Sequence, residues 1–355
     1  MRFPEFSDEW KKYTLGDVSE FSKERVNSQN LSSDNYVATE NMLQDYQGII
    51  ETSSVPTNTN VIKFNKGDVL LSNIRPYLKK VWFADKSGGC SADVFVFKAL
   101  SACIPDYLHY IIANDRFINF AMSGAKGVKM PRGDKEQMKT YEIGLPSIEE
   151  QKKIAKLLSL LDERIATQNK IIEKLESLIK GIAHRVAGMG KPNVCLKECL
   201  ECTSSALQES EVSDLGPYPV YGANGIVGFL DSYNTPDEAI YIVKDGSGVG
   251  SVAYVKGKCS ATGTLHILTA KQEYSLQFLY YILKVFNFEP YKTGMAIPHI
   301  YFKDYGNTMI FCPPYADQLR YAQMLGAIDT KLLLEKNYLI SLNSQKQYLL
   351  RLMFI

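Results

Sequence analysis

The sequence predicts an α+β protein that is built twice. Two α/β globules are separated by two long helices, which pair antiparallel as a coiled coil, and a pseudo-twofold axis relates the two copies. Three observations lead to this prediction. A proline-containing segment recurs, each copy is followed by a long apolar 4-3 spacing, and the regions before each copy hold short β-branched runs between glycine turns.

The composition sets the limits within which a function can be sought. The chain has 355 residues, of which 45% are hydrophobic and 22% charged, so it can form about two domains. Its net charge of +1 excludes any inference of a polyanion partner from the total charge, so a site for nucleic acid has to be local. No run approaches the roughly 18 apolar residues of a membrane span, and the seven cysteines show no disulfide framework. We therefore expect a cytoplasmic protein without a membrane partner.

The clearest repeat introduces the two long helices. Leu145–Gln151 reads Leu-Pro-Ser-Ile-Glu-Glu-Gln, and 167 residues later Cys312–Gln318 reads Cys-Pro-Pro-Tyr-Ala-Asp-Gln. A 4-3 alternation sustained beyond four heptads is typical of a coiled-coil seam, so helices are predicted over 149–188 and 315–355. The first seam comprises Ile154, Leu158, Leu161, Ile165, Gln168, Ile172, Leu175, Ile179, Ile182 and Val186, and the second comprises Tyr321, Leu325, Ile328, Leu332, Glu335, Leu339, Leu342, Lys346, Leu349 and Met353.

The ends of the first helix determine how the second one must run. Residues 188–193, Gly-Met-Gly-Lys-Pro-Asn, terminate it with glycine and then proline. A helix of this length extends about 60 Å, so the second globule begins far from the first. Only an antiparallel return of the final helix covers both seams, and we expect the globules at opposite ends of the pair.

The two globules, 1–148 and 189–314, share a faint pattern of strands and one helical stretch each. Glycine, asparagine and aspartate turns bound the apolar runs, as in strands of a mixed domain. The predicted strands include Val69–Leu71, Val94–Phe97, Ala239–Val243 and Leu265–Leu268, and the predicted helices span about 107–120 and 276–286.

Catalytic and cofactor motifs are weak. The spacing Cys195-x3-Cys199-x2-Cys202 matches an iron-sulfur loop, but we interpret these cysteines as small apolar residues on the opening strand of the second repeat. Cys312–Tyr315 resembles the Asn/Asp-Pro-Pro-Tyr loop of adenine methyltransferases without its Asn or Asp, and Asp245–Gly250 lacks the Lys-Ser/Thr of a phosphate loop. The four histidines show no ligand spacing. We predict no catalytic residue, no metal and no cofactor.

Local charge indicates DNA as the ligand. Residues 60–135 contain 12 Lys and Arg against 6 Asp and Glu, whereas residues 190–314 contain 9 against 12. Lysine and arginine suit phosphates, and arginine and asparagine suit base edges, so Arg75 is expected to reach a base while Lys79 and Lys80 contact phosphates. The predicted DNA-binding residues are Asn73, Arg75, Tyr77, Lys79, Lys80, Lys126, Lys129 and Arg132 in the first globule and Tyr221, Asn224, Lys244, Asp245, Ser247, His299 and Tyr301 in the second.

With the repeat established, the chain resembles the specificity subunit of a type I restriction-modification system. The most specific segment is Leu145–Ile154 leading into Leu161–Ile165, which is similar to the family's first conserved helix and has a second copy from Pro313 to Ile328. Trp10–Val18 resembles the family's opening segment. The segments Asn73–Tyr77 and Tyr221–Ile226 resemble parts of its target recognition domains.

The resemblance implies a division of labour. Residues 1–148 and 189–314 would be target recognition domains, each reading one half of a split site in double-stranded DNA. The helices 149–188 and 315–355 would set the spacer between the halves and dock two modification (methyltransferase) subunits, with restriction (motor-nuclease) subunits joining for cleavage. The chain itself would be non-catalytic, while the assembled complex would methylate adenine and cut DNA.

Three alternatives remain open at this point. A non-catalytic coiled-coil adaptor that binds proteins at both ends would share the helices but not the salt-dependent affinity for DNA. The recognition module of a single-chain restriction-methylation enzyme would need a catalytic domain on the same polypeptide. An adenine methyltransferase acting alone would depend on Cys312–Tyr315.

Overall fold

A computed structural model describes residues 2–52, 54–246 and 248–354. The chain forms two compact units, each of which contains one globule and part of both long helices. Unit 1 comprises Met1–Thr167 and Leu339–Ile355, and unit 2 comprises Gln168–Tyr338. Among the described residues, no helix has a stretch long and apolar enough to cross a bilayer.

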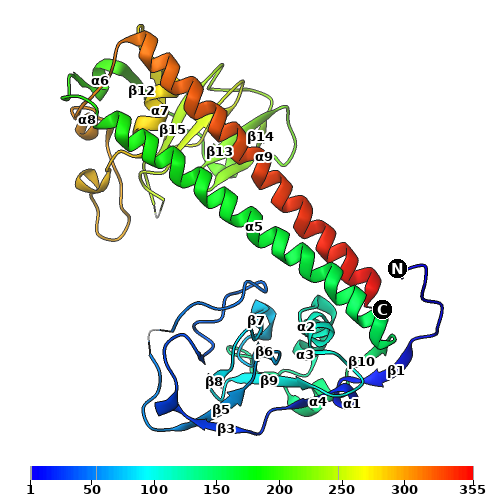
Figure 1. The fold of residues 1–355 in the computed structure, drawn as a ribbon. Helices are drawn as coiled ribbons and strands as arrows, with labels where there is room; N and C mark the ends of the chain where they lie inside the picture. Colours follow the sequence, from blue (N-terminus) through cyan, green and yellow to red (C-terminus); the bar gives the residue numbers. More distant parts are fainter. Residues whose placement is uncertain (1, 53, 247, 355) are drawn as a thin grey trace. The chain divides into compact units, whose positions relative to one another are not determined.

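Unit 1 contains a mixed globule between a short opening strand and the first long helix (Figure 1). Its elements are β1 Lys11–Thr14, α1 Leu15–Val18, β2 Ser19–Phe21, β3 Arg25–Asn27, η1 Ser28–Asn30, β4 Tyr36–Val37, β5 Asn60–Phe64, β6 Val69–Ser72, η2 Pro76–Leu78, β7 Val81–Phe83, β8 Gly88–Cys90, β9 Val94–Ala99, α2 Pro105–Ile112, α3 Asp115–Ser123, α4 Lys135–Lys139 and β10 Glu142–Leu145. The long helices are α5 Ile148–Ala187 and α9 Tyr315–Met353, and each passes through both units.

Unit 2 repeats this order. Its elements are β11 Val194–Cys195, α6 Leu196–Cys199, β12 Leu200–Ser204, η3 Glu209–Glu211, β13 Tyr218–Gly222, β14 Gly225–Leu230, β15 Ala239–Val243, β16 Val252–Val255, β17 Ser260–Ala261, β18 Leu265–Ala270, α7 Leu276–Lys284, η4 Glu289–Tyr291, α8 Phe302–Tyr305 and β19 Met309–Ile310. The predicted fold class, two α/β domains with an internal repeat and long coiled-coil helices, is confirmed.

The sheets of the two units match strand by strand. The four-stranded sheet β2-β9-β6-β7 of unit 1 corresponds to β12-β18-β15-β16 of unit 2, and the pair β1-β10 corresponds to β11-β19. Even the register is preserved, because Leu71 pairs with Phe95 as Ile242 pairs with His266. Every residue of β6 and β15 is buried, as a continuous apolar run predicts for a central strand covered on both faces. The polar turns after these two strands therefore start from a rigid position.

Two local predictions are wrong. The helix predicted over 107–120 is two helices, α2 and α3, because Asn114 lies between them and its side chain accepts a hydrogen bond from the amide of Arg116 as an N-cap. The three cysteines of the second repeat do not share one strand. Cys195 lies in β11, Cys199 ends the helical turn α6, and Cys202 lies in β12.

In both units α5 and α9 run antiparallel and bury the predicted seams. Every seam position is buried or half-buried. The two polar seam residues of unit 2 meet each other, because Gln168 Nε2 donates to Glu335 Oε2 at 2.5 Å and to the Glu335 carbonyl at 3.1 Å. In unit 1, the seam residue Lys346 forms an ion pair with Asp162 at 2.5 Å. These partners explain how a seam can contain polar groups without leaving them unsatisfied.

A buried glutamine holds each globule against the start of its long helix. The side-chain oxygen of Gln151 accepts a hydrogen bond from the backbone amide of Ile104 at 3.0 Å, and its side-chain nitrogen donates to two backbone carbonyls. Gln318 does the same in unit 2, accepting from the Ser275 amide at 2.9 Å and donating to the Pro313 carbonyl. These contacts give a physical reason for the glutamine that ends both copies of the repeated segment.

Candidate nucleic-acid interface

The first predicted cluster lies on the turn between β6 and β7. This turn, residues 73–80, contains η2 and two non-glycine residues in the left-handed region, Arg75 with φ of 52° and Lys79 with φ of 53°. Such a conformation is unfavourable for an L residue by about 1–2 kcal/mol. The turn therefore stores backbone strain where the basic side chains are presented.

The second cluster folds against this turn as a short loop, residues 126–132, which we call finger 1. The amide of Lys126 donates to the Arg132 carbonyl at 2.9 Å, and the amide of Arg132 returns a bond of the same length. At the base of the finger, the Arg75 amide donates to the Pro131 carbonyl at 2.8 Å. The structure thus brings together two basic clusters that are far apart in sequence.

Most lysine and arginine side chains of these two clusters already have a partner within the chain. The Nζ atoms of Lys79 and Lys126 pair with Asp115 and Asp134, both at 2.8 Å, and Lys80 Nζ donates to a carbonyl at 2.7 Å. Arg132 pairs with Asp93 at 3.2 Å, while Lys129 is exposed at the outer end of finger 1. These ion pairs are partly exposed and contribute little to stability, so a phosphate can replace the carboxylate at small cost. The carboxylates reduce the positive charge of this surface without removing it.

The turn also contains two unusual polar atoms. Asn73 Oδ1 and Arg75 Nε are buried and have no hydrogen-bond partner, and they belong to a short set of such atoms among the described residues. A buried polar atom without a partner destabilises a fold by about 1–3 kcal/mol. Together with the left-handed backbone of Arg75, they mark this turn as a place where the local sequence does not favour stability.

Unit 2 builds the same frame with different side chains. Lys244 and Asp245 follow β15 as Asn73 and Ile74 follow β6. Residues 293–299, which we call finger 2, close through paired bonds between Thr293 and His299 at 2.8 and 2.9 Å. The Gly246 amide donates to the Pro298 carbonyl at 3.0 Å, at the position equivalent to the bond from Arg75 to Pro131 in unit 1.

The remaining predicted residues of unit 2 lie near this frame. Tyr221 and Asn224 belong to the β13–β14 hairpin, and the carbonyl of Ala223 in its turn approaches Gly248 of the loop after β15, about 4.0 Å from where a Cβ on that glycine would lie. Tyr301 is 47% exposed, and its ring centroid lies 4.9 Å from that of His299. Ser247 lies outside the described residues.

The sequence analysis did not single out the residues at the ends of the fingers. Val128 and Met295 lie at equivalent positions, each directly after a glycine with positive φ, 97° for Gly127 and 89° for Gly294. Both side chains are fully exposed. The shared Gly-apolar-x-apolar-Pro spacing is visible in the printed sequence and was the signal available for them.

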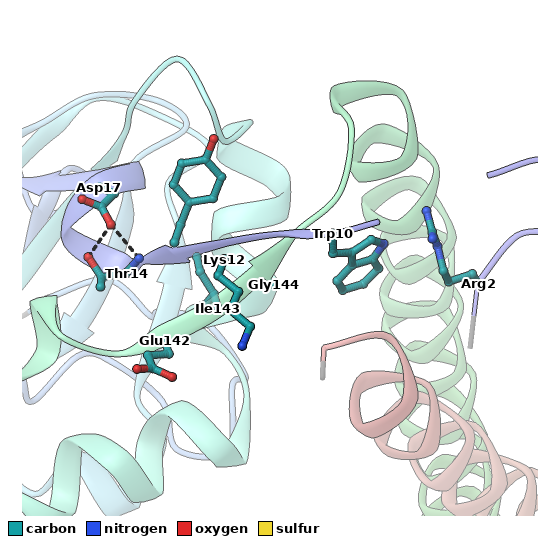
Figure 2. A pocket seen from close by; sticks show the side chains of 9 residues that line it. Arg2, Trp10, Lys12, Thr14, Asp17, Glu142, Ile143 and Gly144 are labelled. Carbon is teal, nitrogen blue, oxygen red and sulfur yellow. Dashed lines mark hydrogen bonds between the residues drawn. The ribbon is translucent and has the colours of Figure 1, made fainter. Parts of the chain in front are cut away.

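A separate cavity of about 730 Å³ lies beside β1 and β10 (Figure 2). Two of its charged groups, Arg2 and Asp17, have partners within the chain. Arg2 donates to both carboxylate oxygens of Glu150, at 2.9 and 2.6 Å, and Trp10 donates to the same carboxylate at 3.2 Å. The backbone amide and hydroxyl of Thr14 each donate to Asp17 at 2.7 Å and hold the pKa of that carboxyl below its usual value. These contacts stabilise the opening segment, and the turn and finger residues do not line this cavity.

Among the described residues, no group of three or more His, Cys, Asp or Glu side chains is arranged to hold a metal ion. The cysteines are free thiols. Burial is the main reason that the pKa of Cys202 rises to about 11. This shift disfavours the thiolate that metals and iron-sulfur clusters bind.

Comparison with known families agrees with the duplicated frame. The model of the type I restriction modification DNA specificity domain matches residues 7–177 and again residues 192–344. The chain belongs to this family. It therefore contains two copies of the specificity domain, and each match covers one globule and part of a long helix.

Two relatives illustrate the sequence similarity of this specificity-domain protein. It is 30% identical over 196 residues to the specificity subunit of the type I restriction enzyme MjaVIII from Methanocaldococcus jannaschii, covering 54% of this chain and 44% of that protein. It is 24% identical over 182 residues to the HindI specificity subunit from Haemophilus influenzae, covering 49% and 40% of the two chains. The matched region thus spans less than half the length of these relatives.

Solved structures share the fold along the whole chain. The S subunit of a type I restriction-modification system from M. genitalium superposes with a TM-score of 0.69 at 19% identity, covering 100% of this chain and 99% of that one. A chain from a study of complex assembly in a type I system gives a TM-score of 0.56 at 20% identity, covering 97% of both. At these identities the likeness supports the specificity-domain fold alone.

Proposed function

We propose that this chain is the DNA-binding specificity subunit of a type I restriction-modification complex, and that each globule reads one half of a bipartite duplex site. One observation carries the proposal. Both units build the same turn and finger, and at the left-handed position of that turn unit 1 has Arg75 where unit 2 has Gly246. Glycine is the residue that this backbone prefers.

The arginine therefore opposes the backbone preference and needs a compensating role. Strained residues that persist in a fold cluster at binding sites. Arginine is the side chain that most often reads guanine, through two hydrogen bonds in the major groove. The position thus favours a base contact for Arg75, surrounded by groups that position the duplex.

The other predicted residues take roles according to their chemistry. Lys79, Lys80, Lys126, Lys129 and Arg132 would neutralise phosphates in the first half-site, with Asn73 and Tyr77 beside them. In the second half-site, contacts would rely mainly on hydrogen bonds and stacking, with Lys244 as the cation for phosphate; the residues are Tyr221, Asn224, Lys244, Asp245, Ser247, His299 and Tyr301. Each half-site then depends on a different balance of forces.

The long helices would set the spacer. In this proposal the recognition domains span 1–148 and 189–314, and the helices span 149–188 and 315–355. The seam side chains are covered, but Leu333 and Leu334 of α9 are 60% and 64% exposed, which leaves an apolar surface for the modification subunits. Two modification subunits and the restriction subunits would complete a complex that acts on cytoplasmic DNA.

The chain would contribute no catalytic group. Cys312, the only candidate for a methyltransferase loop, is 7% exposed, and its amide and carbonyl are both bonded to the side chain of Asn193 at 2.8 Å. Its segment leads into α9, as the equivalent Leu145 segment leads into α5. This placement favours a structural role over an adenine methyltransferase acting alone.

The test combines binding and methylation. Purified chain should enrich one bipartite sequence from a random duplex pool, and its affinity should fall steeply with salt. The same sequence should be methylated in cells only when a modification subunit is present. Binding without sequence preference or salt dependence would favour the adaptor, and methyl transfer by the chain alone would overturn the non-catalytic assignment.

The spacer can be tested separately. Adding one heptad to both helices, beside Gln168 and Glu335, preserves the seam and lengthens it by about 10 Å, or roughly three base pairs. The enriched spacer should lengthen while the half-sites stay the same. A heptad added to one helix only is the control, because it disrupts the register of the pair. Altered half-sites with an unchanged spacer would contradict the proposal.

A further inference from the structure

We infer that the tips of the two fingers, Val128 and Met295, act as apolar wedges that insert between stacked base pairs of the bound duplex. This inference depends on the proposed function, since it assumes that the fingers face DNA. It adds a deformation of each half-site that family membership does not specify. The residues that carry it are exposed, apolar and repeated.

The exposure of these side chains is extreme. Val128 and Met295 show 103% and 107% of their reference surface, and the next apolar residues along each finger, Met130 and Ile297, are 50% and 67% exposed. A single exposed aliphatic residue needs no explanation. Two such residues at the same place in both domains, each followed by a second one, indicate a shared requirement.

The backbone of each finger is closed at its base. The glycine before each tip adopts positive φ, and the finger is closed by paired backbone bonds between its first and last residues. The base of finger 1 is bonded to the Arg75 amide, and that of finger 2 to the Gly246 amide. The tips are thus preorganised beside the residues proposed to contact bases, which limits the entropy lost on binding.

Charge favours a duplex as the occupant. On finger 1, Lys129 follows Val128 directly, and Lys126 and Arg132 lie at the base of the finger; Lys244 lies at the base of finger 2. Cations beside an apolar tip suit phosphates beside a base stack. The faces of two neighbouring bases can cover an aliphatic side chain from both sides, whereas a thymine methyl group covers one side only. Apolar wedges of this kind unstack a base step and kink the duplex.

The experiment uses the full chain and a duplex enriched by it from a random pool. 2-Aminopurine is placed at each position in turn, and its fluorescence reports unstacking. Wild-type chain should raise the fluorescence at one step in each half-site. Val128→Ser should abolish the rise in the half-site read by residues 1–148 and weaken binding about tenfold, and Met295→Ser should do the same in the other half-site.

Matched variants separate this effect from general damage. Val128→Ile and Met295→Leu keep an apolar tip and should retain the signals. Ile50→Ser and Leu215→Ser remove other apolar side chains, 54% and 84% exposed, and should leave both signals intact. Thermal unfolding should be unchanged for Val128→Ser and Met295→Ser, because these two side chains are fully exposed in the free chain.

Several outcomes would overturn the inference. Unchanged 2-aminopurine signals in Val128→Ser and Met295→Ser would show that the tips do not unstack bases. Replacing thymine by uracil in the duplex removes the thymine methyl group. If wild-type chain then loses as much affinity as the serine variants lose on the unmodified duplex, the tips contact thymine methyl groups instead. Normal DNA binding with failure to join the modification subunit would make them a protein contact. If no duplex is enriched at all, the proposed function fails, and the wedge fails with it.

Discussion

The two finger-and-turn sites have the same backbone frame and different chemistry. At equivalent positions unit 1 has Arg75, Lys126 and Arg132, and unit 2 has Gly246, Thr293 and His299. The hydrogen bonds that hold the frame use backbone atoms, so they tolerate these exchanges. Charge, side-chain reach and backbone strain can therefore differ between the halves of the site while the position of the contacts does not.

The same contrast continues into the cores. Unit 1 has Phe95 and Met138 where unit 2 has His266 and Tyr305, which share a hydrogen bond of 3.0 Å. A buried polar pair between the strand β18 and the helix α8 has to keep its hydrogen bond, whereas an apolar pair does not. Unit 2 is thus expected to respond to pH at a position where unit 1 does not.

The largest expected effect comes from Arg75→Gly, which makes the turn of unit 1 like that of unit 2. Loss of a bidentate contact should reduce discrimination at one base pair by about 1–3 kcal/mol, or roughly fivefold to 150-fold. Release of the left-handed strain should leave the free energy of unfolding equal or raise it by up to about 1 kcal/mol. Titration against duplexes with single-base substitutions, together with thermal unfolding, measures both.

The effects of Arg75→Gly on specificity and on stability have separate controls. Arg75→Ala removes the contact but keeps the strain, so it should lose specificity without gaining stability. Gly246→Ala adds a Cβ that meets nothing within 4 Å, and its cost should be the conformational one alone, about 1 kcal/mol. An even loss of affinity for all duplexes in Arg75→Ala would make Arg75 a phosphate contact.

A second comparison concerns the glycines of the fingers. A Cβ on Gly294 would lie 2.4 Å from the Ile297 carbonyl, whereas one on Gly127 would lie 3.3 Å from the Met130 carbonyl. Gly294→Ala should therefore lower the free energy of unfolding by about 1–3 kcal/mol and Gly127→Ala by about 1 kcal/mol. Denaturant unfolding of both variants measures the difference, and equal losses would mean that finger 2 relaxes freely.

Features that depend on neighbouring residues could be predicted from the sequence, and features that depend on contacts between distant segments could not. The seams, β6, β9, β15 and β18 were predictable because periodicity and apolar runs are local signals. The break at Asn114 was missed because an N-cap competes with an otherwise helical pattern. The approach of finger 1 to the turn at Arg75 depends on backbone bonds between distant segments, and no local pattern encodes such a contact. The strain at Arg75 was equally invisible, since arginine does not signal positive φ.

The pH response should test the buried pair of His266 and Tyr305. Burial also lowers the pKa of His109 in unit 1 to about 4, so the effect of His266 has to be isolated with a variant. Burial, with a smaller contribution from Lys244, lowers the pKa of His266 to about 4, so the folded chain keeps this histidine neutral. The unfolded chain takes up a proton near pH 6.5, so the stabilisation is complete above that pH and is lost as pH falls toward 4. We expect unit 2 to lose about 2 kcal/mol between pH 7 and 5. Thermal unfolding across this range should be flatter when His266→Phe is combined with Tyr305→Phe, and an identical slope would assign the effect to other groups.

The smallest expected effect comes from exchanging charge between equivalent exposed positions. Lys129 on finger 1 corresponds to Ala296 on finger 2, and both are exposed. Each phosphate contact contributes about 0.9 to the slope of log affinity against log salt concentration. Lys129→Ala should reduce that slope by about 0.9 and Ala296→Lys should raise it by a similar amount, because the frame places both side chains alike. The enriched base sequence should stay the same in both variants, since phosphate contacts carry no sequence information. A slope that changes for Lys129→Ala but not for Ala296→Lys would mean that finger 2 lies farther from the backbone of the duplex, and that the two halves differ in position as well as in charge.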